Sequence, residues 1–484
     1  MRKAIVFLAV SGLIGLACGQ PAVEWERTYL ATDCSGFRDV RATRDGGFIA
    51  VGHACVRPDS ARAAWLVKLN DLGDTLWTRM YRPAERSHGI TVAEVRTGGF
   101  VIAVEGQDDT TLSAAFLIRT DADGDTLWVR RYTYGGVEYV GSVIPTSDGG
   151  FLLCGCTEDL GAGPFDAWAV KTDANGDTLW NRAFRFAVDD YTLASSVSEM
   201  DDGYILAGSL YRSMSADWQC FLAVLDHQGD TLWVRHYGSW ADESLVDAKI
   251  HPNGGYALAV SVSHYDPEQP SGGTILRIAE NGDSLWSAAV YGGGTWFNEL
   301  RVLPDGGYAV SGYIPSGQGG QSYSFLRRLD CLGDSLWEMG FTAPYTGRGA
   351  FLALDRSNDG GFILSGNAMR DTLYGGAWAL KTESDPLVTR GPAVSSPHRF
   401  TLLQNDPNPF NPRTEITFEL TVSADVLLHV FDLLGREVAV LHEGMATAGE
   451  HRVSFDGTGL PSGIYVCRLE VDGRTESHKM VLLR

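Results

Sequence analysis

Positive charge is scarce in this sequence, and it is not clustered. The 484 residues include 39 lysines and arginines against 60 aspartates and glutamates, which gives a formal net charge of −21. A nucleic-acid-binding protein needs clustered lysines and arginines to meet the phosphates, and no such run occurs in this sequence. The composition therefore argues against a nucleic-acid partner.

Long apolar runs are also few. After the first nineteen residues no stretch approaches the roughly 20 apolar residues that a membrane-spanning helix needs, so we expect no transmembrane segment in the mature form. Residues 1–19 combine a basic start, "MRK", the apolar run "AIVFLAVSGLIGLA" and small residues at the end. This pattern predicts a signal peptide cleaved between Gly19 and Gln20. Lipidation of Cys18 is the alternative, which Gly15 disfavours because a leucine usually stands there.

Recognised catalytic and metal-binding motifs are missing. The sequence lacks the GxSxG, HExxH and P-loop patterns, and its eleven histidines are scattered. Cys154 and Cys156 have no second cysteine pair to complete a zinc site, so we expect buried thiols, and Cys34 with Cys55 is the favoured disulfide. We therefore predict no catalytic residue, no metal and no cofactor. Because triads assemble from residues distant in sequence, an enzymatic function stays open.

The sequence does contain a repeated phrase. "DADGDTLWVRRY" at 121–132 recurs in five further variants, and the six anchor tryptophans are spaced 51 to 53 residues apart. Between them a second phrase, DGG(F/Y) with close variants, occurs seven times. A fixed period near 50 residues indicates stacked or radial repeats. The six anchors are Trp77, Trp128, Trp180, Trp233, Trp286 and Trp337.

Each period contains four β-like runs bounded by glycine and aspartate, which is typical of a β-propeller blade. The last period lacks its fourth run, whereas "VEWERTY" at 23–29 matches that run and stands before the first complete period. We therefore predict an all-β protein with a seven-bladed β-propeller closed by the N-terminal strand. The strand around Trp25 should pair with residues 377–383, which would leave no long exposed edge.

Two chemical interpretations of the repeated turn are weaker than a structural one. "DADGD" at 121–125 begins like a calcium loop, but Tyr132 stands where that loop needs a bidentate glutamate. The phrase "DxxGDTLW" is similar to the tryptophan-docking repeat of quinoprotein propellers, which usually have eight blades and a dedicated cofactor pocket. We count seven, so we expect a propeller without a quinone. The repeats also resemble the blades of secreted bacterial surface propellers, which implies an extracellular location.

The repeats stop before residue 385, and a different module follows. We expect a signal peptide at 1–19, the propeller at 20–384 and a linker at 385–398, where proline, serine and glycine accumulate. Residues 399–484 contain about seven short strand-like runs with turns between them. This pattern predicts a small Ig-like β-sandwich.

The final segment contains "PNPFNP", "VFDLLGREV", "AGEH", "SGIY" and "KMVLL" in that order. It resembles the C-terminal sorting domain of proteins exported by the type IX (Por) secretion system, although a flagellar-hook-type Ig-like sandwich would share its fold. The resemblance implies export by the Sec route, then recognition by the type IX machinery at the outer membrane of a diderm bacterium. The protein would be secreted or displayed on the outer cell surface. The residues that carry the resemblance to the sorting domain are Pro407, Asn408, Pro409, Phe410, Asn411, Pro412, Gly435, Gly449, Gly463, Tyr465 and Lys479.

Four acids follow connections between blades, with aromatic residues such as Tyr139 and Tyr191 beside them. Such connections converge on one propeller face, so the acids could form a partial ring that binds a cation or a glycan. The alternative is that each acid accepts hydrogen bonds from backbone N–H groups where blades meet. The candidate binding residues are Glu138, Asp190, Glu243, Glu299, Trp240 and Trp296.

These observations favour a surface-displayed protein whose propeller has a binding, adhesion or scaffold role, with an extracellular glycan or protein as ligand. The alternative is a secreted hydrolase or lyase that acts on an extracellular polymer. A cluster of carboxylates with perturbed pKa values, or a His–carboxylate pair, in the channel would favour the enzyme, and a shallow aromatic rim without one would favour binding.

Overall fold

The computed structural model describes residues 20–32, 34–56, 61–107, 113–132, 136–158, 165–186, 191–212, 217–238, 241–263, 272–292, 295–314, 323–345, 349–369, 375–387, 400–403, 405–420, 423–432, 436–471 and 474–483. The regular elements in these ranges are β-strands, so this is an all-β protein. The predicted signal peptide at 1–19 lies outside the described residues.

Seven antiparallel sheets of four strands each account for the repeats, and we call them blades 1 to 7 in chain order. Blade 1 contains β2 (Ser35–Ala42), β3 (Phe48–Val56), β4 (Ala61–Leu69) and β5 (Thr75–Tyr81). Blade 2 contains β6 (Arg86–Glu94), β7 (Phe100–Gln107), β8 (Ser113–Thr120) and β9 (Thr126–Tyr132). Blade 3 contains β10 (Glu138–Pro145), β11 (Phe151–Thr157), β12 (Asp166–Thr172) and β13 (Thr178–Phe184). Blade 4 contains β14 (Tyr191–Met200), β15 (Gly203–Arg212), β16 (Asp217–Leu225) and β17 (Thr231–Tyr237).

The remaining three blades follow the same order, with one exception at the last. Blade 5 contains β18 (Asp242–Ile250), β19 (Tyr256–Ser263), β20 (Gly272–Ile278) and β21 (Ser284–Gly292). Blade 6 contains β22 (Trp296–Val302), β23 (Tyr308–Ile314), β24 (Tyr323–Leu329) and β25 (Ser335–Thr342). Blade 7 contains β26 (Gly349–Arg356), β27 (Phe362–Met369) and β28 (Gly375–Thr382), and its fourth strand is β1 (Val23–Tyr29).

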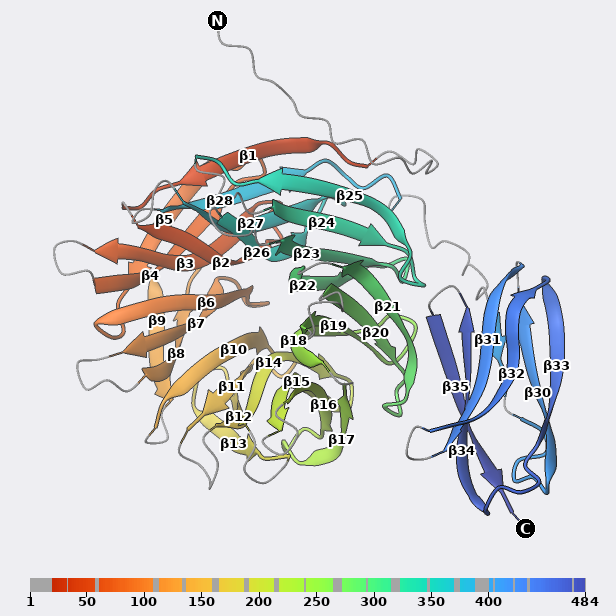
Figure 1. Cartoon of the computed structure of the whole chain (residues 1–484). Coiled ribbons are helices and arrows are strands. Elements are labelled where there is room, and N and C mark those ends of the chain that lie inside the picture. The colour runs from red at the N-terminus through yellow and green to blue at the C-terminus, as the bar shows by residue number, and fades with distance from the viewer. Residues whose placement is uncertain are drawn as a thin grey trace, which may run out of the picture.

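The first strands of the blades stand around a common centre (Figure 1). Each contacts the first strand of the next blade, and β26 contacts β2. β1 pairs antiparallel with β28, with Trp25 opposite Lys381 and Tyr29 opposite Ala377. Trp25 and Tyr29 share a buried apolar cluster with Phe37 of blade 1. This arrangement of seven four-stranded sheets fits a β-propeller.

The repeated phrase joins neighbouring blades. The Trp25 indole N–H donates to the Asp71 carbonyl oxygen at 2.8 Å, and the Tyr29 hydroxyl donates to the Gly73 carbonyl oxygen at 2.7 Å. Gly73 has a φ of 78°, and a Cβ placed there would lie 2.9 Å from the Trp25 ring. Glycine therefore serves twice, since it permits the turn and makes room for the preceding blade's tryptophan. The same contact recurs at Gly124, Gly176, Gly229, Gly282 and Gly333.

A disulfide joins two cysteines of the propeller, and the carboxylate of Asp385 packs against blade 6. Cys34 and Cys55 form a disulfide with a Cα–Cα distance of 5.3 Å, so the favoured pairing is confirmed. Asp385, placed at the start of the linker from the sequence, is buried. Its carboxylate accepts hydrogen bonds from the Arg328 guanidinium at 3.1 Å and from the Trp337 indole at 3.4 Å. Asp385 therefore belongs to the contacts of blade 6.

Two further sheets form the C-terminal part (Figure 1). One has the order β29-β30-β33 and the other β32-β31-β34-β35, and their buried side chains belong to one apolar cluster. Their strands are β29 (Phe400–Leu402), β30 (Arg413–Leu420), β31 (Ala424–Asp432), β32 (Glu437–Ala446), β33 (Gly449–Asp456), β34 (Gly463–Val471) and β35 (Arg474–Leu482).

Candidate functional site

The first strand of every blade contains a β-bulge. Its register against the second strand shifts by one residue, so one residue per blade is left without a partner in the ladder. All seven of these residues line one cavity of about 740 Å³. We call them the bulge ring: Arg38, Ile90, Gly141, Ser195, Val246, Asn298 and Leu352.

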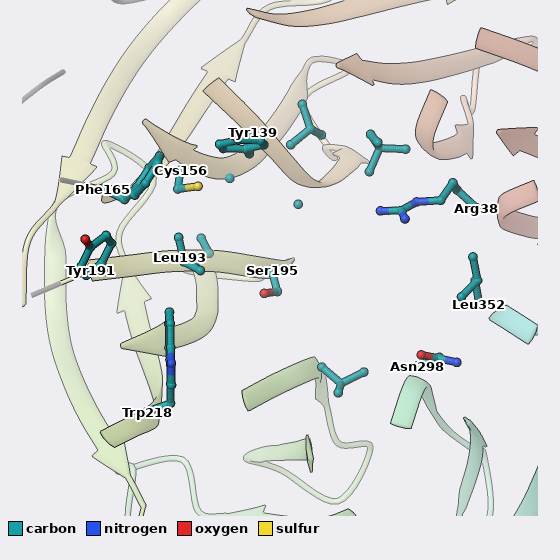
Figure 2. Close-up of a pocket in the computed structure, with 16 residues that line it drawn as sticks. Arg38, Tyr139, Cys156, Phe165, Tyr191, Leu193, Ser195, Trp218, Asn298 and Leu352 are labelled. Carbon is teal, nitrogen blue, oxygen red and sulfur yellow. The ribbon is translucent and has the colours of Figure 1, made fainter. Parts of the chain in front are cut away.

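A row of aromatic side chains forms one wall of this cavity. Tyr139, Phe165, Tyr191 and Trp218 line it, and Tyr211 stands between the last two. Neighbouring ring centroids in this aromatic row are 5.3 to 6.0 Å apart. The row comes from blades 3 and 4: Tyr139, Tyr191 and Trp218 stand at the starts of β10, β14 and β16, Phe165 directly precedes β12, and Tyr211 stands at the end of β15. Figure 2 shows its labelled members on one side of the cavity and Arg38 on the other.

A second cavity of about 530 Å³ adjoins the first, because Tyr139 borders both. Arg62, Arg86, His88 and Glu105 line it. The Arg62 Nη1 donates to the His88 Nε2 at 3.1 Å, which leaves the proton of the neutral imidazole on Nδ1. Blades 1 and 2 therefore contribute basic side chains beside the Tyr139 end of the aromatic row.

Burial shifts the pKa values of the titratable groups in this second cavity. Burial, and then the charges of Arg62 and Arg38, lower the pKa of His88 to about 4. Glu105 stands opposite His88 in the β6–β7 ladder and accepts a hydrogen bond from the Val140 N–H at 2.9 Å. Burial raises the pKa of Glu105, and that hydrogen bond and Arg38 offset only part of the increase. With a pKa of about 4, the His88 imidazole is neutral at neutral pH.

Further along the same first strands, charged residues form ion pairs within and between blades. Arg41 of blade 1 and Arg301 of blade 6 each lie 2.7 Å from a Glu299 carboxylate oxygen. The other Glu299 oxygen accepts a hydrogen bond from the Leu354 N–H of blade 7 at 2.9 Å. Burial by itself raises the pKa of Glu299, but Arg301 and Arg41 lower it to about 2. This carboxylate is therefore ionised and engaged by the scaffold.

Three of the four acids expected at the channel mouth lie in the described residues, and they stand at different positions relative to their bulges. Glu138 and Glu243 stand three residues before their bulges and are buried, and Glu299 stands one residue after its own. Trp296 is 40% exposed, whereas Asp190 and Trp240 lie outside the described residues. Because Glu299 lies deeper along the channel than the other two, the three do not form one ring.

The sequence interpretation singled out only part of the cavity wall by residue. It named Tyr139 and Tyr191 but not Phe165, Trp218 or the arginines. Each bulge residue stands nine or ten residues before the aromatic of its DGG(F/Y) phrase. This nearly constant offset relates the seven positions to the repeat once one bulge is known, but the seven side chains share no chemistry that would mark them in the sequence.

The described ranges contain no group of three histidine, cysteine, aspartate or glutamate residues placed to hold a metal ion. In the same ranges there is no helix long and apolar enough to cross a membrane.

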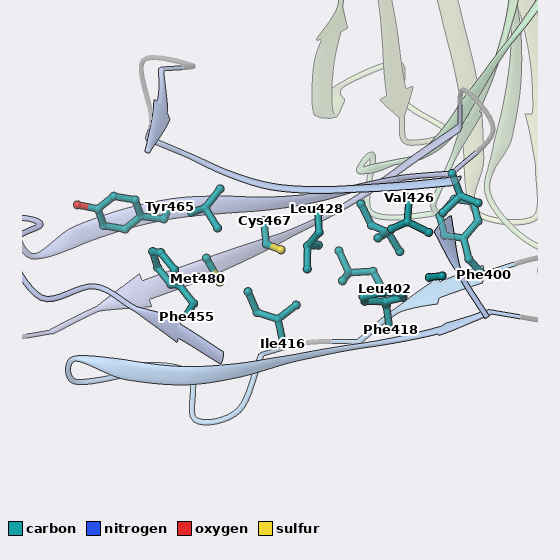
Figure 3. Close-up of a cluster of buried hydrophobic side chains, with 14 of the residues drawn as sticks. Phe400, Leu402, Ile416, Phe418, Val426, Leu428, Phe455, Tyr465, Cys467 and Met480 are labelled. Carbon is teal, nitrogen blue, oxygen red and sulfur yellow. The ribbon is translucent and has the colours of Figure 1, made fainter. Parts of the chain in front are cut away.

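The PNPFNP loop near the start of the sorting domain forms hydrogen bonds with its last strand, β35. The Asn408 amide donates to the Lys479 carbonyl oxygen at 3.0 Å and accepts from the Val481 N–H at 2.8 Å. The buried Phe410 exchanges backbone hydrogen bonds with Val481 and Leu483. The motif and the last strand therefore form one unit, with Tyr465 in the core beside it (Figure 3).

Among the other expected sorting residues, the Pro407 carbonyl oxygen accepts hydrogen bonds from the Asn405 amide and the Thr414 hydroxyl, and the Pro412 carbonyl oxygen accepts one from the Gly457 N–H. Gly449 has a φ of 123°, a value that glycine tolerates, and nothing lies near a Cβ placed at Gly463. Pro407, Pro409, Asn411 and Pro412 belong to the same loop, and Gly435 lies outside the described residues.

Residues 407–483 match the family model of the secretion system C-terminal sorting domain. The domain marks proteins that the type IX system secretes, so this protein reaches the cell surface or the extracellular space. It also implies an interaction with the type IX machinery.

Beyond this domain the comparisons are distant. No curated protein matches the sequence. A puromycin hydrolase mutant is 13% identical with a TM-score of 0.49, over 80% of this chain and 58% of that chain. A fungal alcohol oxidase of the AA5 family in complex with copper is 11% identical with a TM-score of 0.47, over 96% and 100%. A putative exo-beta-1,3-galactanase from Bifidobacterium bifidum s17 is 12% identical with a TM-score of 0.33, over 56% and 97%. Likenesses this weak carry no functional conclusion.

Proposed function

We propose that the protein is a surface-displayed β-propeller, closed by β1, that binds an extracellular glycan at the bulge ring. Residues 1–19 act as the signal peptide, cleaved before Gln20, and residues 20–384 form the propeller. A linker at 385–398 precedes an Ig-like sorting domain at 399–484. Binding, with an adhesion or scaffold role, is the function of the propeller.

The aromatic row is the observation that carries this proposal. Flat aromatic faces suit sugar rings, and a concave site with few polar groups is the usual form of a ligand pocket. The aromatic row runs from Tyr139 to Trp218 on blades 3 and 4. The side chains of Tyr139, Tyr191 and Trp218 are at least partly exposed. The burial of Glu138, Glu243 and Glu299 supports a structural role for these acids.

A glycan panel tests the proposal. Calorimetry on the protein without its signal peptide should detect at least one bound polysaccharide. Tyr191→Ala together with Trp218→Ala should weaken that binding at least about tenfold, because each packing contact with an aromatic ring contributes on the order of 1 kcal/mol. Tyr345→Ala removes an exposed aromatic outside this cavity and serves as the control. Equal binding by both variants would remove the aromatic row from the site.

A second function is favoured by one observation, the position of His88 opposite Glu105 in the cavity wall. A neutral imidazole beside a carboxyl group with a raised pKa is an arrangement that a hydrolase or lyase could use. The Arg62 contact occupies the Nε2 of His88, which makes this arrangement a poorer general base. Release of new chain ends from a polysaccharide by wild type, lost in Glu105→Gln, would establish the enzyme.

A further inference from the structure

We propose that the ligand is an acidic polysaccharide, and that Arg38, Arg62 and Arg86 bind its anionic groups while its rings contact the aromatic row. This inference rests on the proposed glycan-binding function and specifies its ligand class. The shared chemistry is an oxyanion on a sugar ring, either the carboxylate of a uronic acid or a sulfate ester.

Unpaired arginines are unexpected in a chain with a net charge of −21. Arginines on the outer strands of the blades meet aspartates, as Arg27, Arg79 and Arg130 do. Within the described residues, no aspartate or glutamate forms an ion pair with Arg38, Arg62 or Arg86. Three such guanidinium groups at two adjoining cavities therefore create a local excess of positive charge.

Their positions suit a ligand that reaches across the channel mouth. Arg38 is exposed in the bulge ring, Arg62 stands near the start of β4, and Arg86 opens β6. Tyr139 separates Arg62 and Arg86 from the rest of the aromatic row. A sugar ring packed against Tyr139 would thus have guanidinium groups beside it, and a planar guanidinium donates two parallel hydrogen bonds to a carboxylate or a sulfate.

The other titratable groups at the cavity do not cancel this charge. His53 and His88 are neighbours with ring centroids 5.6 Å apart, and neutral imidazoles leave the arginine charge unchanged. Among the described residues that line the two cavities, Glu105 is the one acid, and the Val140 N–H occupies one of its oxygens. Within these residues three cations thus face one carboxyl group.

Calorimetry with matched probes tests the inference. The probes are polygalacturonate and its carboxyl-reduced form, and dextran sulfate and dextran. Wild type should bind at least one charged polymer and bind its neutral counterpart at least about tenfold more weakly, because each charge-assisted hydrogen bond contributes more than a neutral one. Binding should weaken as salt is added. The charged polymer that binds identifies carboxylate or sulfate as the anion.

Arginine variants locate the binding. Arg38→Gln with Arg62→Gln should lower affinity for the charged polymer at least about tenfold, whereas Arg38→Lys should keep part of it. Arg130→Gln removes an exposed arginine of an outer strand and is the control for net charge. Unchanged melting temperatures would show that the variants are folded.

The outcomes separate the two proposals. Equal binding of charged and neutral polymers, or full binding by Arg38→Gln/Arg62→Gln, would overturn the acidic ligand and leave glycan binding intact. Absence of binding to these probes and to a wider glycan panel would overturn both.

Discussion

At the scale of single residues, the aspartate of the DGG phrase pairs with a buried cation. The Lys171 ammonium lies 2.7 Å from Asp148, and Lys68 lies 2.9 Å from Asp45. Lys381 and Asp359 form the corresponding pair in blade 7. The aspartate thus orders the Gly-Gly turn through the backbone and also neutralises a lysine from the third strand.

This pair predicts a specific acid sensitivity. Partial burial by itself raises the pKa of Asp148, but hydrogen bonds from Lys171, Thr146 and the Gly150 N–H lower it to about 2. A carboxyl group with a lowered pKa stabilises the fold above its unfolded-state pKa, near 4, and loses this contribution as the pH falls toward 2. Melting temperatures from pH 7 to pH 2 should therefore fall steeply below pH 4 in wild type and less steeply in Asp148→Asn. Parallel curves for the two proteins would contradict this assignment.

Gly149 and Gly176 have similar positive φ values but different surroundings. Substitutions at the two positions therefore distinguish the cost of the turn conformation from the cost of packing against tryptophan. Gly176 and Gly149 have φ values of 80° and 87°, but a Cβ at Gly176 would meet Arg130 and Trp128 within 2.8 Å. Nothing lies within 4 Å of a Cβ at Gly149. Gly149→Ala should cost about 1 kcal/mol of unfolding free energy and Gly176→Ala roughly 1–3 kcal/mol more. Denaturant titration measures both, and equal losses would show that packing against Trp128 contributes nothing.

At the scale of the strand, β1 is the element that joins distant parts of the sequence. It supplies the fourth strand of blade 7, and its Trp25 contacts the turn of blade 1. Removal of residues 20–30 should therefore expose the β28 edge and loosen blade 7 before the other blades. Hydrogen exchange should accelerate in β26–β28 and change little in blade 3. Uniform acceleration, or none, would count against a local role for β1.

The four-strand period follows from the sequence because turn residues and strand length are local properties, and the partner of β1 follows because the last repeat lacks its fourth run. The cavity does not. A bulge depends on the register between two strands, so nothing in "SGFRDVRA" marks Arg38 as the unpaired residue. The acids Glu138 and Glu299 stand near similar connections in sequence, yet a difference of a few residues along the strand places them at different depths. The distances between side chains of different blades are set by the ring, which local sequence does not encode.

At the scale of the whole molecule, the propeller and the sorting domain can be separated, and the position of the cut matters. A truncation after Thr382 would also remove Asp385, which accepts hydrogen bonds from Arg328 and Trp337. A truncation after Leu387 retains it. In a host with the type IX machinery, this longer propeller should fold and fail to reach the surface, and immunodetection on intact cells would measure the loss.

The control for that experiment is the stability of the truncated propeller. β21 of blade 5 contacts β35 of the sorting domain, so a small decrease in melting temperature is expected. The protein ending at Leu387 should melt close to the full-length protein and above the one that ends at Thr382. Surface display equal to that of the full chain would refute the sorting role of residues 407–483.

The pairing of β1 with β28 also sets an order in time. During synthesis β1 emerges well before its partner β28, which follows only after blades 1 to 6 have been made. Contacts between strands so distant in sequence form slowly, because the chain between them must first be brought together. Until then the newly made protein carries an unmatched strand at one end and an open sheet edge at the other. The interval between synthesis and completion of blade 7 is therefore when this chain is most exposed to proteases and to pairing with a second copy of itself.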